Sequence, residues 1–308
     1  MKTIFARFTL ALFAVTFFAS AATAQERAPL LVNSAWLAQH LHDANLVILQ
    51  VKDPADKTAD FSSGHIPGAQ EISLDDISTS TESGGHKLSL ELPPIEKLTS
   101  AFESRGISND SRIVVYTTTR EISYATRTIW TLTYYGLGDR VSLLDGGLGA
   151  WRAAGNAVAS DTATPAPGKL TPHIDPEIFA DAVWVDSHLH QPGVSIIDGR
   201  WAGSYNGSDD EGKKEGWVRG GRIPGAQNIP VEEFLNTDGL FKDNAAIAEL
   251  FDKAGVKSGN QILGYCYIGQ RATVIWLTAT MLGYHARLYD GSWQDWSART
   301  DLPVEYPK

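Results

Sequence analysis

Two kinds of apolar pattern alternate along this chain. Short runs of consecutive apolar residues, such as LVILQV at 46–51 and QILGYC at 261–266, are typical of strands buried on both faces. Between such runs lie stretches with helical spacing that end in glycine, such as IEKLTSAFESRG at 95–106. This alternation predicts an α/β fold with a mainly parallel sheet flanked by helices. Further strands are expected at 112–117, 141–146, 194–200 and 285–291, and further helices at 128–138, 244–255, 272–284 and just after 291.

The pattern occurs twice. Three blocks recur in the same order at offsets between 145 and 157 residues. They are GHIPGA (64–69) and GRIPGA (221–226), ATRTIW (125–130) and ATVIW (272–276), and LLDGGLGAW (143–151) and LYDGSWQDW (288–296). Ordered recurrence of this kind predicts a duplicated domain.

A linker is expected between the two copies. The segment SDTATPAPGKLTPHIDP is rich in Pro, Thr, Ala and Ser and has no apolar periodicity. We therefore predict an N-terminal domain at 25–160, a linker at 161–175 and a C-terminal domain at 176–308.

The first residues have the pattern of a secretory leader. Lys2 and Arg7 precede an apolar run from Phe8 to Ala19, and the stretch closes with Ala22-Thr23-Ala24. We expect a signal peptide at 1–24 that is cleaved after Ala24, with an uncleaved anchor as the alternative. The predicted location of the mature chain is the periplasm.

Charge and cysteine content narrow the functional classes. The formal net charge is −10, and it becomes −12 when Lys2 and Arg7 are removed. Such an acidic chain argues against nucleic acid or an anionic membrane as a partner. Exported proteins usually pair their cysteines in disulfides, but this chain has one cysteine, Cys266. It is either a buried structural residue or a reactive group.

The position of Cys266 favours reactivity. It ends a predicted strand, and ligands of open α/β sheets bind outside the carboxyl ends of the strands. The loop from Cys266 to the next helix can present its backbone N–H groups as a nest for an anion, with Gly269 allowing an unusual backbone conformation. The candidate loop residues are Tyr267, Ile268, Gly269, Gln270 and Arg271.

Several donors are needed for this chemistry. Only a thiolate is a good nucleophile, and a free cysteine titrates near pH 8.5. A helix terminus contributes about 0.3–1 kcal/mol, which is less than one pKa unit. Loop N–H groups and a nearby Arg271 are therefore expected to act together.

The duplicated blocks, with a cysteine and six-residue loop only in the second copy, resemble the tandem-domain rhodaneses. These are thiosulfate and 3-mercaptopyruvate sulfurtransferases, and the resemblance covers essentially the whole mature chain. It implies a catalytic C-terminal domain and an inactive N-terminal domain, in which Thr117 stands at the position of Cys266. It also implies that Cys266 takes sulfur from a small-molecule donor as a persulfide and passes it to an acceptor such as cyanide, without a metal or organic cofactor.

The resemblance leaves the donor open. Thiosulfate enzymes of this family have a loop like Cys-Arg-Lys-Gly-Val-Thr and mercaptopyruvate enzymes one like Cys-Gly-Ser-Gly-Val-Thr, and this loop matches neither. Arg200, in the Asp198-Gly199-Arg200 stretch, is by resemblance a candidate anion contact; the alternative is a structural ion pair with Asp198. Mercaptopyruvate enzymes carry a second arginine at the position of Ser204, so we expect a preference for thiosulfate.

Other functions remain as alternatives. A persulfide carrier or partner-binding module would use the same cysteine without turnover. A phosphatase on this fold would need Cys-x5-Arg, whereas Cys266 and Arg271 are one residue closer. His65 and Arg222 are expected to stabilise turns, and Asp145 and Asp290 to occupy turns after strands. Trp293 and Trp296 are expected to pack in the core or in a lid, with the wall of the pocket as the alternative for Trp293.

Overall fold

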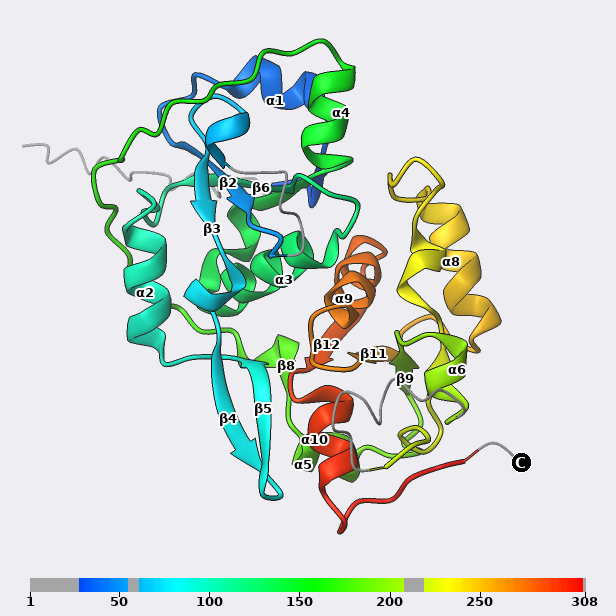
Figure 1. The fold of residues 1–308 in the computed structure, drawn as a ribbon. Coiled ribbons are helices and arrows are strands. Elements are labelled where there is room, and N and C mark those ends of the chain that lie inside the picture. The colour runs from blue at the N-terminus through cyan, green and yellow to red at the C-terminus, as the bar shows by residue number, and fades with distance from the viewer. Residues whose placement is uncertain (1–27, 55–60, 208–218, 307–308) are drawn as a thin grey trace, which may run out of the picture.

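The computed structural model describes residues 28–54, 61–207 and 219–306. The predicted signal peptide at 1–24 and its cleavage site lie outside these residues. Figure 1 shows two α/β units, joined by a long connection that runs along the first. Within the described ranges, no helix is long and apolar enough to cross a membrane.

Each unit contains a five-stranded sheet in which all pairings are parallel. The strand orders are β1-β7-β6-β2-β3 and β8-β12-β11-β9-β10, which are the same when corresponding strands are matched. The duplication and the parallel α/β fold predicted from the sequence are therefore confirmed. The first sheet consists of β1 (Leu31–Val32), β2 (Leu46–Val51), β3 (Gln70–Ile72), β6 (Arg112–Thr117) and β7 (Val141–Leu144), and the second of β8 (Phe179–Ala180), β9 (Val194–Asp198), β10 (Gln227–Asn228), β11 (Gln261–Tyr265) and β12 (His285–Tyr289).

Helices cover the sheets, and several begin at side chains that cap their free N–H groups. Asn33, Asp181 and Asp243 each accept a hydrogen bond from the first turn of a helix. The α-helices are α1 (Ser34–His40), α2 (Ile95–Glu103), α3 (Ser123–Leu132), α4 (Gly147–Ala153), α5 (Ala182–Ser187), α6 (Ala202–Tyr205), α8 (Asn244–Lys253), α9 (Ala272–Met281) and α10 (Ser292–Ala298). Single turns of 3₁₀ helix lie at Phe61–Ser63, Leu74–Asp76, Gly138–Arg140, Pro176–Ile178 and Val231–Phe234, and a π-turn follows α3 at Thr133–Leu137.

One apolar core joins the two units. Side chains of a strand point alternately to opposite faces. In β6, Val114 and Tyr116 belong to the cluster that contains α1 and α4, whereas Ile113 and Val115 belong to a second cluster. This second cluster contains α2 and α3 and continues into α8 and α9 of the other unit. The hydroxyls of Thr126 on α3 and Thr273 on α9 lie 2.6 Å apart in this contact.

A hairpin that the apolar pattern does not predict reaches from the first unit to the second. Strands β4 (Thr79–Ser83) and β5 (His86–Glu91) pair antiparallel and extend beside α10 (Figure 1). At its tip, a Cβ added to Gly84 would lie 2.9 Å from the carbonyl oxygen of Ala298. The hairpin therefore packs closely on the second unit.

The predicted linker at 161–175 contains no helix or strand. It follows the surface of the first unit, where a Cβ added to Gly168 would lie 1.9 Å from the carbonyl oxygen of Ile107. The side chain of Glu103 also accepts a hydrogen bond from the N–H of Leu170. The segment is thus a packed connection; the predicted domain boundaries themselves stay predictions.

Candidate functional site

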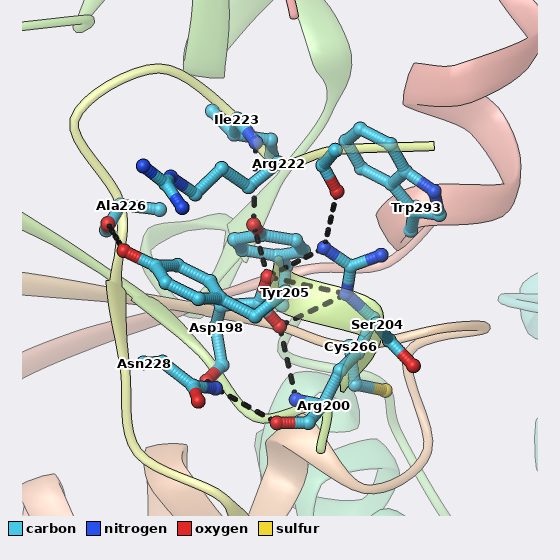
Figure 2. Close-up of polar contacts among 12 residues, drawn as sticks. Asp198, Arg200, Ser204, Tyr205, Arg222, Ile223, Ala226, Asn228, Cys266 and Trp293 are labelled. Carbon is cyan, nitrogen blue, oxygen red and sulfur yellow. Dashed lines mark hydrogen bonds and ion pairs between the residues drawn. The ribbon is translucent and has the colours of Figure 1, made fainter. Parts of the chain in front are cut away.

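Cys266 lies directly after β11, the central strand of the second sheet. It is a free cysteine, and its side chain is fully buried. Because side chains alternate along a strand, Tyr265 belongs to the cluster with α5 and α10, while Cys266 belongs to the cluster shared by both units. Figure 2 draws Cys266 together with Asp198 and Arg200, which come from the end of the neighbouring strand β9.

Helix α10 holds the first two carbonyl groups of the loop after β11. The carbonyl oxygen of Cys266 accepts a hydrogen bond from the N–H of Trp293 over 3.1 Å, and that of Tyr267 accepts one from Gln294 over 2.9 Å. A trans peptide is planar, and its N–H points opposite to its C=O. The N–H groups of Tyr267 and Ile268 therefore point away from α10.

The last part of the loop is held in the same way. The carbonyl oxygen of Gly269 accepts a hydrogen bond from Arg127, and that of Gln270 accepts one from the N–H of Thr273. The N–H groups of Gln270 and Arg271 thus point away from these partners. Within the part of the chain that the structure describes, the N–H groups of residues 268–271 have no hydrogen-bond acceptor. Four adjacent donors are available for an anion.

The amide of Cys266 itself is fixed by a strained residue. Its N–H donates to the hydroxyl of Ser292 over 3.1 Å, and this hydroxyl donates to the carbonyl of Tyr289 over 2.8 Å. Ser292 has a φ of 51°, a left-handed conformation that costs a non-glycine residue about 1–2 kcal/mol. The start of α10 therefore stores strain directly behind the candidate nucleophile.

Arg200 forms the structural ion pair that the sequence left as one of two alternatives. Its Nη2 lies 2.7 Å from Oδ2 of Asp198, and both side chains are almost completely buried (Figure 2). Burial alone would lower the pKa of Arg200, but the charge and hydrogen bonds of Asp198, together with the neighbouring Tyr265 and Tyr267, raise the pKa overall. The guanidinium also lies 4.5 Å over the ring of Trp293. Its role as an anion contact stays a prediction.

The first unit contains a neutral counterpart of this arrangement. There the hydroxyl of Tyr116 accepts the N–H of the IPGA block and donates to Gln50, at the position that Asp198 occupies in the second unit. Thr117 follows Tyr116 as the counterpart of Cys266. Only the second unit therefore combines a thiol with a buried ion pair.

The guanidinium of Arg271 binds a carboxylate outside the loop. It forms an ion pair with Glu232 and lies 4.7 Å over the ring of Trp201. Partial burial would raise the pKa of Glu232, but the hydrogen bond and charge of Arg271, together with hydrogen bonds from the backbone and from Trp201, lower the pKa overall. The positive charge of Arg271 is thus compensated by Glu232. The geometry therefore supports a contribution from the backbone N–H of Arg271 and not from its side chain.

The remaining loop side chains point to different surroundings. The hydroxyl of Tyr267 hydrogen-bonds with Ser204, so a neutral hydroxyl pair occupies the place where the resemblance expects a second arginine in mercaptopyruvate enzymes. Ile268 and Gln270 line a cavity of ≈ 650 Å³ whose other walls come from the first unit. The amide of Gln270 also donates to Ser123 on the first unit over 2.8 Å.

The residues expected to be structural have structural contacts. His65 and Arg222 form β-bridges to Ala159 and Glu305, and these bridges tie the two IPGA blocks to the end of each unit. Trp293 and Trp296 are fully buried. Asp145 accepts the N–H of Phe241. In the described ranges, no group of three or more His, Cys, Asp or Glu residues could hold a metal ion.

Asp290 does more than the predicted turn formation. Its carboxylate forms a buried ion pair with Arg127 of the first unit, at 2.5 Å, and accepts the N–H of Leu92 over 2.9 Å. Neither Arg127 nor Ser292 was predicted from the sequence. A signal for Arg127 was present, because it interrupts an apolar helix where the second copy has Val274.

Comparison with known proteins decides the family. A model described as a rhodanese-like domain matches residues 33–154 and again residues 181–299. This chain belongs to the tandem rhodanese family of sulfurtransferases. Both matches fall inside the two predicted domains of this rhodanese.

Three relatives illustrate the range of names within the family. A Mycobacterium tuberculosis protein whose name includes "thiosulfate sulfurtransferase" is 32% identical, over 91% of this rhodanese and 98% of the relative. Sulfur carrier protein TtuD of Thermus thermophilus is 29% identical, over 89% and 95%. The crystal structure of the Escherichia coli 3-mercaptopyruvate sulfotransferase SseA matches with a TM-score of 0.74 and 28% identity, covering 86% of this rhodanese and 99% of that chain.

Proposed function

We propose that this protein transfers a sulfane sulfur from thiosulfate to a thiophilic acceptor such as cyanide through a persulfide on Cys266. The single observation that carries the proposal is the direction of the peptide groups after Cys266. The carbonyl oxygens of Cys266, Tyr267, Gly269 and Gln270 are bound to α10, Arg127 and α9, so the N–H group of each of these peptides points away from that partner. A buried sulfur anion needs such donors, because burying a charge without compensation is costly.

The reaction has two halves. The thiolate of Cys266 attacks the outer sulfur of thiosulfate, a new S–S bond forms, and sulfite leaves with the electron pair of the bond that breaks. Cyanide then attacks the outer sulfur of the persulfide, a C–S bond forms, and thiocyanate leaves as the Cys266 thiolate returns. The loop N–H groups stabilise the negative sulfur in both resting forms.

The charges near Cys266 support thiosulfate over 3-mercaptopyruvate. Arg200 is paired with Asp198 and Arg271 with Glu232, so neither guanidinium is left uncompensated for a carboxylate. Ser204, paired with Tyr267, offers only hydroxyl groups. Backbone N–H groups suit the small, symmetric sulfonate end of thiosulfate without requiring an arginine for the carboxylate of an α-keto acid.

Steady-state assays with each donor, in the presence of cyanide, test this proposal. We expect continuous sulfite release from thiosulfate, with a higher kcat/KM than pyruvate release from 3-mercaptopyruvate. A higher kcat/KM for 3-mercaptopyruvate would reverse the order of donors. The name of the Thermus thermophilus relative makes a sulfur carrier the second candidate, and release of one equivalent of sulfite followed by arrest would favour it.

A further inference from the structure

Arg127 brings a charge from the first unit to the loop of the second. It lies on α3 and is completely buried. Its Nη1 donates to Oδ1 of Asp290 over 2.5 Å and to the carbonyl oxygen of Gly269 over 3.2 Å, and its Nη2 donates to the carbonyl oxygen of Leu90 over 2.7 Å. The guanidinium also lies 4.6 Å over the ring of Trp130. One side chain thus ties together the hairpin, the end of β12 and the centre of the loop.

The contact with Gly269 sets the direction of the next peptide N–H. With its carbonyl held towards Arg127, this peptide turns the N–H of Gln270 to the opposite side. Gly269 has a φ of 78°, and a Cβ there would lie 2.3 Å from the carbonyl oxygen of Asp290. The loop is therefore packed directly on the segment that Arg127 holds, and it cannot shift independently.

Arg127 has no equivalent in the second unit. The hydroxyl contact between Thr126 and Thr273 aligns α3 with α9, and the next residues are Arg127 and Val274. The copy without the cysteine thus carries the arginine. Arg127 contacts the carbonyl of Gly269 in the loop and the carboxylate of Asp290, on which the loop packs. It would therefore affect Cys266 only through the position of the loop.

We propose that Arg127 is a positioning residue, through which the first unit aligns the N–H groups of the loop for the sulfur chemistry of Cys266. This inference rests on the proposed function. It gives the unit without a cysteine a defined part in the reaction: a buried cation that fixes one loop carbonyl and neutralises Asp290.

The test uses a variant that removes the cation without leaving an isolated buried charge. Arg127→Gln combined with Asp290→Asn replaces the ion pair with two neutral side chains, of which Asn keeps the shape of Asp and Gln is shorter than Arg. We expect the alkylation rate of Cys266 by iodoacetamide at pH 7 to fall by about 3- to 10-fold, since one loop donor loses its alignment. The pH at which this rate is half-maximal should rise, and sulfur loading from thiosulfate should slow in parallel.

Arg287→Gln is the matched control. Arg287 is also buried, pairs with Glu177 and lies 5.0 Å over the ring of Trp184, but it does not contact the loop. This variant should lower the thermal midpoint of unfolding and leave the alkylation profile unchanged. If the double variant does not fold, Arg127→Lys provides the measurement, because lysine keeps the charge beside Asp290 but lacks the fork that reaches two carbonyls.

An alkylation profile like that of the wild type, in either folded variant, would overturn the positioning role. Failure of the proposed function has a different signature. If the wild-type protein takes up no sulfur from thiosulfate, the persulfide mechanism falls, while the alkylation profiles still report whether Arg127 aligns the loop.

Discussion

At the scale of single residues, the loop after Cys266 is shaped by partners that are distant in the sequence. Arg127 and Ser292 lie 142 and 26 residues from the groups they contact there. The position of Cys266 at a strand end was readable from the sequence, because it depends on a local apolar pattern. The partners of its loop were not readable, because they depend on how two units pack. The sequence also left both roles of Arg200 open, and only its ion pair is visible in the structure.

Gly269→Ala should displace the loop, because it adds a steric clash to the strain of a positive φ. The added Cβ would meet the carbonyl oxygen of Asp290 at 2.3 Å, so the loop must move. We expect sulfur loading from thiosulfate, followed by mass spectrometry, to slow by about 10- to 100-fold, because reacting groups tolerate little displacement.

Gly255→Ala is the control for Gly269→Ala. Gly255 has nearly the same φ, 77°, but a Cβ there has nothing within 4 Å. This variant should lose stability and keep the loading rate. Equal loading rates in the two variants would show that the position of the loop does not matter.

At the scale of elements, the strands and helices with strong periodicity were predicted in place, although α3 begins at Ser123 and not at the predicted 128. The hairpin β4–β5 was missed. The segment at 79–91 is largely polar, with Leu88 and Leu90 as its only aliphatic residues, so its apolar pattern is weak. Its order comes instead from α10. Ser83 hydrogen-bonds to Asp295, and the N–H of Ser89 donates to Gln294. Since Gln294 also donates to the carbonyl of Tyr267, the hairpin and the loop share one support.

The hairpin should make stability depend on pH through Glu91. Burial, reinforced by the charge of Asp290, raises the pKa of Glu91 from 4.5 to about 8. Between these values the folded state holds more protons than the unfolded state, so this group weakens the fold as pH rises through that window. Glu91→Gln removes the titration and keeps an oxygen for Gln294. At pH 8 the free energy of unfolding of Glu91→Gln should exceed that of the wild type by about 1 kcal/mol or more, and its thermal midpoint should be higher.

The gain from Glu91→Gln should vanish well below pH 4.5, where the wild-type carboxyl is protonated in both the folded and the unfolded state. Glu82→Gln, an exposed position on the same hairpin, should not change the pH dependence of the thermal midpoint. An equal gain at every pH, or no gain at pH 8, would contradict this account of Glu91.

At the scale of the whole molecule, the duplication was readable because the two copies keep their blocks in order. The different roles of the two units were only partly predictable from the sequence. The resemblance assigned the cysteine to the second copy, whereas the shared core and the ion pair between Arg127 and Asp290 became visible only in the structure. The charge of a helix residue gives no information about which unit it will face. Export to the periplasm stays a prediction.

The central claim is that one sulfur atom resides on Cys266 between donor and acceptor. Mass spectrometry of the intact protein after exposure to thiosulfate measures this directly. We expect the mass to rise by one sulfur atom, cyanide to return it to the starting value, and Cys266→Ser to prevent the gain. Sulfur uptake that persists in Cys266→Ser, or a wild-type protein that gains no sulfur, would contradict it.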